Sequence, residues 1–304
     1  MNQIVQPAIA IIGLGSMGYG MAQSLRRRGF AVTGYDISAE AMARFAAEGG
    51  AVAASPCEAA RDADVLALVV VNAAQTESVL LGADGALSAM APGGVVLACA
   101  TMAPDAVRRL ALAVRATGRD YLDTPISGGA VRAAAGELTI MGSGAHDTFA
   151  RLKPVLDAMA TRVYELGSDP GTGAAFKMVN QLLAGVHIAA ACEAITFARA
   201  LGLDLTRVYE VITASAGNSW MFENRVPNIL EGDYSPRSAV NIFTKDLGIV
   251  ADMGRGLNFP TPVASTALQM FLMTAAAGFG RDDDASVARM LAGLAGLDLP
   301  AGEA

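Results

Sequence analysis

Two groups of residues in this chain have types and spacings that could do chemistry. A glycine-rich turn, Gly13–Gly18, follows an uncharged apolar run, and Asp36 comes eighteen residues after its last glycine. This pattern can bind the pyrophosphate and one ribose of a dinucleotide. Much later in the chain, Lys177 and Asn180 stand three residues apart in a helix-favouring stretch. They would share one helix face and offer an amine base beside an amide.

The glycine turn has the surroundings that dinucleotide binding requires. Gly13 permits a tight turn from strand to helix, Gly15 lets the backbone approach a pyrophosphate, and Gly18 lets helix and strand pack closely. The helix that follows offers unpaired N–H groups and partial positive charge to the phosphates. A glycine-rich turn in another α/β domain is the alternative. We predict cofactor contacts from Gly13, Leu14, Gly15, Ser16, Met17 and Gly18.

Asp36 indicates which dinucleotide binds. A carboxylate at the end of the second strand can accept hydrogen bonds from a ribose diol, and it repels a 2′-phosphate. The next residues are Ile37 and Ser38, and neither can neutralise a phosphate. The sequence therefore predicts NAD as the cofactor in preference to NADP.

Lys177 is the predicted general base. Removing hydride from an alcohol carbon requires a base for the hydroxyl proton, which is most often a histidine. The two histidines suit this role poorly, because His146 lies at an exposed helix start and His187 lies in an apolar helix. Small residues precede Lys177, and partial burial would lower its pKa toward neutrality. On spacing alone, a surface lysine beside a capping asparagine is the more common arrangement.

Alternating strands and helices in the first half must position the glycine turn. Continuous apolar runs such as Val65–Val71 are typical of strands buried on both faces. We expect a doubly wound parallel sheet. Ligands of such sheets lie beyond the carboxyl ends of the strands, which places Asn72 and Thr101 at the cofactor. The predicted strands end at Ile12, Tyr35, Ala53, Val71, Cys99 and Asp123, and two more cover Leu138–Met141 and Arg162–Leu166.

The second half is predicted to be helical. A break at Ser168–Gly173 precedes a long helical stretch that continues to Arg199. We therefore expect an α/β chain with a Rossmann dinucleotide-binding domain over residues 1–167. An all-α domain over residues 168–304 follows it, and a long interdomain helix joins the two. Further helices are expected at Leu205–Ser215, Ser238–Arg255, Pro262–Ala277 and Ser286–Leu294.

Composition narrows the class of protein. Of the 304 residues, 53% are hydrophobic and 17% are charged, and the net charge of −7 argues against a nucleic-acid partner. Three cysteines without metal-ligand spacing indicate free thiols in a reducing cytoplasm and no metal site. The start Met1–Ile4 lacks the pattern of a signal peptide. No window of about 18 residues is both uncharged and strongly apolar, so no membrane partner is expected.

Four motifs resemble the β-hydroxyacid dehydrogenase family, whose members include 3-hydroxyisobutyrate dehydrogenase and tartronate semialdehyde reductase. They are the glycine turn, Asp123–Gly129, the Gly173-x-x-x-Lys177-x-x-Asn180 stretch and Lys245-Asp246-Leu247, and they occur in the family's order over nearly the whole chain. The resemblance implies that Lys177 is the acid/base, and that Lys245 reaches cofactor and substrate. It also implies that Ser127, Gly128 and Gly129 bind the substrate carboxylate. Without the resemblance, Ser127–Gly129 would be a flexible turn and Lys245-Asp246 a solvated pair.

A narrower resemblance, in Val69–Gln75, Leu182–Ala190 and Ala216–Arg225, indicates a branch of the family that oxidises a four-carbon sugar acid with NAD. That branch can carry histidine where this chain has Asn180. The polar groups beside Trp220 could line a polyol pocket or pack in the core. The rival hypotheses are 3-hydroxyisobutyrate or 2-hydroxy-3-oxopropionate chemistry, a non-catalytic dinucleotide sensor, and an imine-reducing relative. Apolar helices such as Val263–Ala277 indicate a homodimer or homotetramer.

Overall fold

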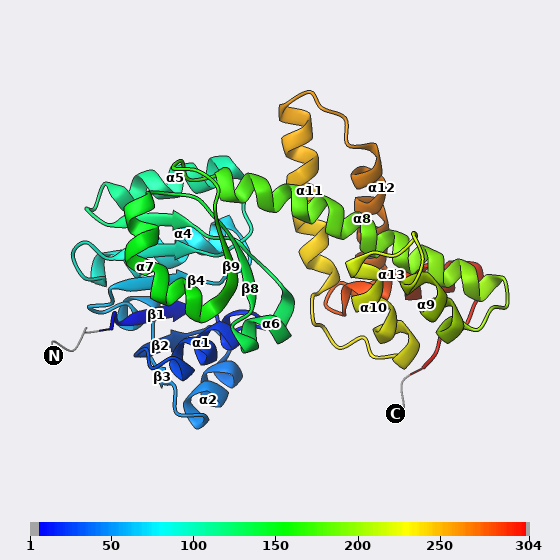
Figure 1. Cartoon of the computed structure of the whole chain (residues 1–304), viewed down its shortest axis with the longest axis horizontal. Helices are drawn as coiled ribbons and strands as arrows, with labels where there is room; N and C mark the ends of the chain where they lie inside the picture. The colour runs from blue at the N-terminus through cyan, green and yellow to red at the C-terminus, as the bar shows by residue number, and fades with distance from the viewer. Residues whose placement is uncertain (1–5, 302–304) are drawn as a thin grey trace. The chain divides into compact units, whose positions relative to one another are not determined.

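The computed structural model describes residues 6–301 of the chain. Met1–Ile4, on which the expectation about a signal peptide depends, lie outside the described residues. The chain forms two compact units, Met1–Lys177 and Met178–Ala304. They divide inside the long helix α8 (Thr172–Ala200), whereas the expected boundary follows residue 167 (Figure 1).

The first unit contains the predicted doubly wound parallel sheet. Its strand order is β3-β2-β1-β4-β5-β6, and every neighbouring pair is parallel. The chain therefore starts at the centre of the sheet, winds to one edge and returns to build the other. The strands are β1 (Ile9–Ile12), β2 (Val32–Tyr35), β3 (Ala51–Val52), β4 (Val65–Leu68), β5 (Val95–Ala98) and β6 (Asp120–Asp123). The helices between them are α1 (Gly18–Arg27), α2 (Ala39–Ala47), α3 (Pro56–Ala59), α4 (Ala73–Leu81), the short 3-10 helix Leu87–Ala89 and α5 (Pro104–Arg115).

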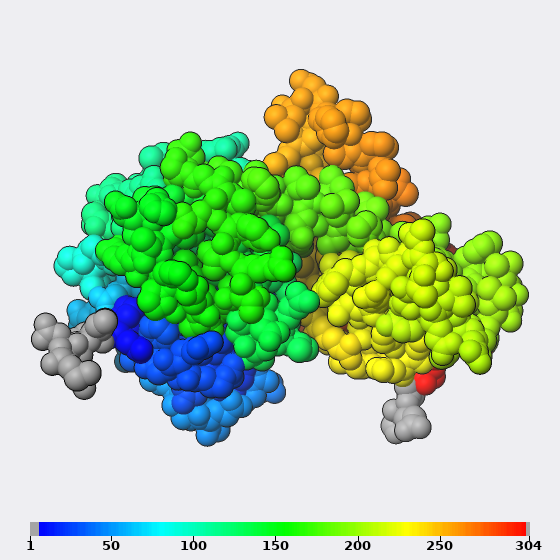
Figure 2. Space-filling view, viewed as in Figure 1, coloured from blue at the N-terminus to red at the C-terminus, as the bar shows by residue number. Residues whose placement is uncertain are grey.

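Successive strand residues face opposite sides of this sheet and build two separate cores. Ile9 and Ile11 pack in one cluster with Leu25 of α1, whereas Ala10 and Ile12 pack in another with Leu110 of α5. Because both faces are covered, β1, β4 and β5 are buried along their whole length. This explains their continuous apolar sequences. In the space-filling view, the visible face of this unit is a continuous surface (Figure 2).

A three-stranded sheet completes the first unit. Its strands β8 (Leu138–Gly142) and β9 (Ala160–Glu165) lie near their predicted positions, with α7 (His146–Met159) between them. The short strand β7 (Ile126–Ser127) and helix α6 (Gly129–Ala135) were not predicted. β7 pairs antiparallel with β8, which sets Ser127 opposite Thr139.

The described part of the second unit is helical, as predicted. Its core gathers Ile188 and Ile195 of α8 with Phe243 and Phe271 from later helices. The helix α10 was not predicted. After α8 come α9 (Leu205–Thr213), α10 (Trp220–Glu231), α11 (Val240–Gly256), α12 (Pro262–Thr274), the single π-helical turn Ala275–Phe279, the 3-10 turn Asp284–Ser286 and α13 (Val287–Ala295).

Two helical segments, Thr172–Ala200 and Pro262–Phe279, are long and apolar enough to cross a membrane by length and composition alone. This differs from the sequence-based expectation that no such window exists. In α8, 56% of the apolar window is buried, as expected of a core helix. The window in the other segment is 22% buried.

Candidate active site

The glycine turn contains three glycines, and the structure explains the need for glycine differently at each position. Gly13 has a φ of +100°, which L side chains rarely adopt, and a Cβ there would collide with the carbonyl oxygen of Val69. A Cβ at Gly18 would collide with the carbonyl oxygen of Gly13. Gly15 differs, because the space beside it is open. Gly13 and Gly18 are therefore required for the conformation of the turn. Gly15 leaves the backbone open to the close approach of a pyrophosphate, so the turn fits a dinucleotide.

Asp36 is tied to the same turn. Its Oδ2 accepts a hydrogen bond from the Leu14 N–H at 2.6 Å, and its Oδ1 accepts one from the Ser38 N–H at 2.7 Å. The Leu14 amide therefore orients Asp36 and does not point to a phosphate. Each carboxylate oxygen keeps a second lone pair, which leaves Asp36 able to accept a ribose diol.

Asn72 and Thr101 follow the carboxyl ends of neighbouring strands β4 and β5. The Asn72 side chain caps α4 by accepting from the Gln75 N–H at 2.9 Å. Val69, three residues before Asn72, lies against Gly13. The end of β4 therefore adjoins the glycine turn within the first unit.

The first turn of α8 is fixed to the end of β6. Asp123 Oδ2 accepts from the N–H groups of Gly171 at 3.0 Å and Ala174 at 2.8 Å. Ser143 Oγ accepts from the Gly173 N–H at 3.0 Å, and a Cβ at Gly173 would collide with the Met141 carbonyl oxygen. This close approach explains the glycine of the Gly-x-x-x-Lys motif.

Lys177 follows Gly173 by four residues and so lies on the same helix face, toward the sheet. Its side chain is 7% exposed, which is far less than expected of a surface lysine. The two histidines, which are the alternative candidates for the general base, are less buried than Lys177. His146 is 80% exposed and binds Glu165, which raises its pKa, and His187 is half-buried.

Ser127–Gly129 also adjoins β8. Ser127 pairs with Thr139, two residues before Met141, which contacts Gly173. Two residues of strand span about 7 Å. Gly128 and Gly129 have φ angles of +142° and +78°, and the space beside Gly129 is open. Within the first unit, the predicted carboxylate loop and the start of the lysine-bearing helix therefore lie against one strand.

In the second unit, a chain of polar contacts links Asn180 to Lys245. Asn180 Nδ2 donates to Gln181 Oε1 at 2.9 Å, and Gln181 Nε2 donates to Asp246 Oδ2 at 2.5 Å. Lys245 Nζ lies 2.5 Å from Asp246 Oδ1. Because Asp246 is only 1% exposed, Lys245-Asp246 is not a solvated pair.

Gln181 and Asp246 were missed as site residues, as were Asp123 and Ser143. Asp123 and Asp246 lie inside motifs that the sequence singled out, and membership of those motifs was the available signal. Nothing in the sequence marks Ser143 or Gln181, because Asp123 is 20 residues from Ser143 and Asp246 is 65 residues from Gln181.

The stretch around Trp220 holds one buried aromatic side chain and one half-exposed aromatic side chain. Phe222 is 3% exposed and stacks on Tyr209, with ring centroids 6.1 Å apart. Asn218 Nδ2 donates to Glu223 Oε1 at 2.5 Å. Trp220 itself is 47% exposed.

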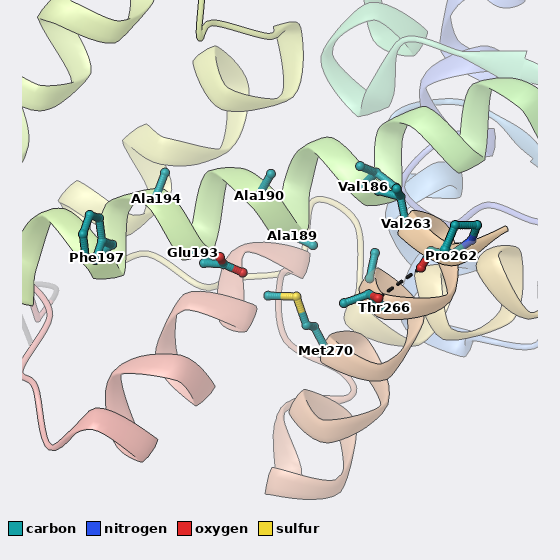
Figure 3. Close-up of a pocket in the computed structure, with 11 residues that line it drawn as sticks. Val186, Ala189, Ala190, Glu193, Ala194, Phe197, Pro262, Val263, Thr266 and Met270 are labelled. Atoms are coloured by element: carbon teal, nitrogen blue, oxygen red, sulfur yellow. Dashed lines mark hydrogen bonds between the residues drawn. The ribbon is translucent and has the colours of Figure 1, made fainter.

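A groove of about 500 Å³ in the second unit lies between α8 and α12 (Figure 3). Phe197 and Val263, each 63% exposed, are among its lining residues. Among the described residues that line it, Glu193 alone is charged. The groove includes none of the predicted catalytic residues. Across residues 6–301, no cluster of His, Cys, Asp or Glu side chains could hold a metal ion, and the three cysteines are free.

Two family models match the chain. Residues 8–167 match the NAD binding domain of 6-phosphogluconate dehydrogenase. Residues 171–291 match a domain described as NAD-binding of NADP-dependent 3-hydroxyisobutyrate dehydrogenase.

Similar proteins cover nearly the whole chain. An L-threonate dehydrogenase of Cupriavidus necator is 51% identical over 94% of this chain and 96% of its own length. An L-threonate dehydrogenase of Escherichia coli is 46% identical over 94% of this chain and 95% of its own. The crystal structure of a 3-hydroxyisobutyrate dehydrogenase from Salmonella typhimurium is 49% identical, covers 94% of this chain and 100% of its own, and has a TM-score of 0.89.

These matches confirm the predicted two-domain fold, the NAD cofactor and the class of NAD-dependent hydroxyacid dehydrogenase. The chain belongs to the β-hydroxyacid dehydrogenase family, in its 3-hydroxyisobutyrate dehydrogenase-like group.

Proposed function

We propose that this chain oxidises L-threonate to 2-oxo-tetronate with NAD. The observation that carries the substrate is the 51% identity, over 94% of the chain, to a relative named L-threonate dehydrogenase. The burial of Lys177 on the helix face that packs on β8 supports the reaction type.

Lys177 is the general base in this proposal. Its amine takes the hydroxyl proton of the substrate while NAD, when bound, supplies the acceptor for the hydride. A base must be uncharged before it takes a proton, and burial disfavours the charged form of an amine. The 7% exposure of Lys177 therefore suits this role.

The remaining residues hold the substrate and the cofactor. Ser127 and the N–H groups of Gly128 and Gly129 bind the carboxylate, because loop N–H groups at positive φ form an anion site. Asn180 orients the reacting hydroxyl, and Lys245 adds a positive charge held by Asp246.

Asp36 reads the adenine ribose, and the backbone of Gly13–Gly18 approaches the pyrophosphate with Ser16 and Met17 at the helix start. Asn72 and Thr101 border the nicotinamide side. The free cysteines support a cytoplasmic location.

One assay tests the substrate. Purified protein is given NAD and each of L-threonate, D-threonate, 3-hydroxyisobutyrate and L-serine, and NADH formation is followed. The proposal requires the highest kcat/KM with L-threonate. A higher value with 3-hydroxyisobutyrate would favour the second candidate, the name borne by the Salmonella structure. Tight NADH binding without turnover of any hydroxy acid would indicate a sensor.

A substitution tests the base. Lys177→Ala should lower kcat by roughly 10²–10⁴ while NADH affinity is kept. Lys153→Ala is the matched control, because that lysine is 71% exposed and pairs with Asp157. Near-native kcat in Lys177→Ala would refute the assignment.

We also propose that the chain forms a homodimer or homotetramer through the groove between α8 and α12. Its exposed apolar lining supports this, since monomers seldom leave large apolar patches uncovered. Val263→Glu should lower the sedimentation coefficient, whereas Leu112→Glu, at an exposed leucine of α5, should not. An unchanged coefficient for Val263→Glu would exclude the groove as the interface.

A further inference from the structure

Helix α8 is capped by residues distant in sequence. The first N–H groups of a helix have no partner within it, and a nearby side chain usually supplies one. Here Gly171, which precedes the helix, has no side chain to do so. Asp123 Oδ2 and Ser143 Oγ accept from Gly171, Gly173 and Ala174 instead.

Asp123, at the end of β6, and Ser143, directly after β8, are hydrogen-bonded to each other. Ser143 Oγ lies 3.2 Å from Asp123 Oδ2, and the backbones of the two residues exchange two hydrogen bonds of 3.0 and 2.8 Å. Both side chains are fully buried. The cap is therefore part of the sheet framework and moves with it.

The hydrogen bonds that Asp123 and Ser143 accept from the first turn of α8 determine the position of the Lys177 side chain. Lys177 follows Ala174 by three residues and Gly173 by four, so the three share one face of the helix. Helical side chains lean toward the N-terminus, over the preceding turn. The stem of Lys177 thus lies over the turn that Asp123 and Ser143 hold.

The turn has little freedom to slide. A Cβ at Gly173 would collide with the Met141 carbonyl oxygen and approach Asp123 Oδ2 to 3.1 Å, so the helix backbone already touches β8. Losing the cap would leave three N–H groups without their partners and free the turn to shift. A displacement of about 1 Å can cost a factor of about 10² in turnover.

We propose that Asp123 and Ser143 are positioning residues for the reaction, which hold the first turn of α8 so that the Lys177 amine is presented to the substrate hydroxyl. This rests on the proposed role of Lys177 as base.

The test compares Asp123→Ala, Asp123→Asn and Ser143→Ala in the full-length protein. Asp123→Ala should lower kcat about 10²-fold and Ser143→Ala about tenfold, with NADH affinity within about twofold of the native value. Asp123→Asn keeps an acceptor oxygen for the N–H groups and should restore kcat to within about tenfold. Asp120→Asn is the control, because Asp120 begins the same strand but is 49% exposed and binds Arg151.

Native kcat in both Asp123→Ala and Ser143→Ala would overturn the proposal. So would equal losses of kcat in Asp123→Ala and Asp123→Asn, because the acceptor oxygen would then not be the cause. If Asp123→Ala fails to bind NADH, Ser143→Ala and Asp123→Asn decide. Lys177→Ala separates the proposed base from the proposed positioning role. Full activity in Lys177→Ala refutes Lys177 as the base. Loss of activity in Lys177→Ala, together with native activity in the Asp123 and Ser143 variants, refutes only the positioning role.

Discussion

Asp123 should make the first unit less stable as the pH rises from about 4 to about 6. Burial raises the pKa of its carboxyl group from 3.8 to about 6, against the opposing hydrogen bonds from Ala174, Gly171 and Ser143. Between these values the folded state holds a proton that the unfolded state has released. The free energy of unfolding falls with pH wherever the folded state binds more protons. A rise of about two pKa units corresponds to about 3 kcal/mol.

Urea unfolding followed by circular dichroism, at pH values from 4 to 7, measures this contribution. In Asp123→Asn the side chain cannot titrate. The native protein should therefore lose about 3 kcal/mol more than the variant over this range.

The opposite slope would refute the reasoning. If the native protein gained stability relative to Asp123→Asn as the pH rose, the N–H donors and the partial positive charge at the helix start would outweigh burial. The folded-state pKa would then lie below 3.8, the ordinary value.

Three further substitutions test other parts of the structure. Asp36→Ala should raise the KM for NAD about tenfold, because charged hydrogen bonds are worth about 1.5–3 kcal/mol. It should also reduce the preference for NAD over NADP, measured as the ratio of the two kcat/KM values. Asp246→Asn should raise the KM for the hydroxy acid about tenfold, through loss of the charge facing Lys245; an unchanged KM would remove Lys245 from the substrate site. Arg225→Met should destabilise the second unit by about 3–5 kcal/mol, because it leaves the buried Asp284 unpaired, and unfolding followed by Trp220 fluorescence would report it.

The parallel sheet could be predicted because its strands are local and distinctive. β1, β4 and β5 are apolar throughout. Gly13 directly follows β1, and Asn72 follows the end of β4 by four residues. The glycine turn could be assigned because the backbone geometry demands glycine there. By contrast, the two-residue strand β7 exists only through pairing with β8, which local sequence does not specify.

The missed helix α10 has a different cause. Pro227 lies inside it, and the residues Gly217, Asn218 and Ser219 that precede it resemble a loop. Its position is fixed by a distant contact, since Arg225 binds Asp284 with Nε 2.5 Å from Oδ1 across 59 residues. Sequence periodicity carries no information about such a pair.

For the candidate site, the sequence pointed to residues that would touch substrate and cofactor, whose roles stay predictions, and it did not indicate the residues that support them. Lys177 and Asn180 share a face by helix geometry alone, which the spacing reveals. Their supports come from separate places: Asp123 and Ser143 hold the turn before Lys177, and Gln181 and Asp246 hold Asn180.

The division into units falls between Lys177 and Met178, so the proposed base and the proposed orienting amide belong to different units. Their separation is nevertheless set by three residues of continuous helix, a rise of about 4.5 Å. The backbone hydrogen bonds of α8 fix that separation whatever either unit does. Because the proposed base and the proposed orienting amide stand on a single helix, their spacing along that helix is constant. Asp123 and Ser143 hold the beginning of α8 to the strands of the first unit. The hydrogen bond between Gln181 and Asp246 holds a later part of α8 to α11 in the second unit.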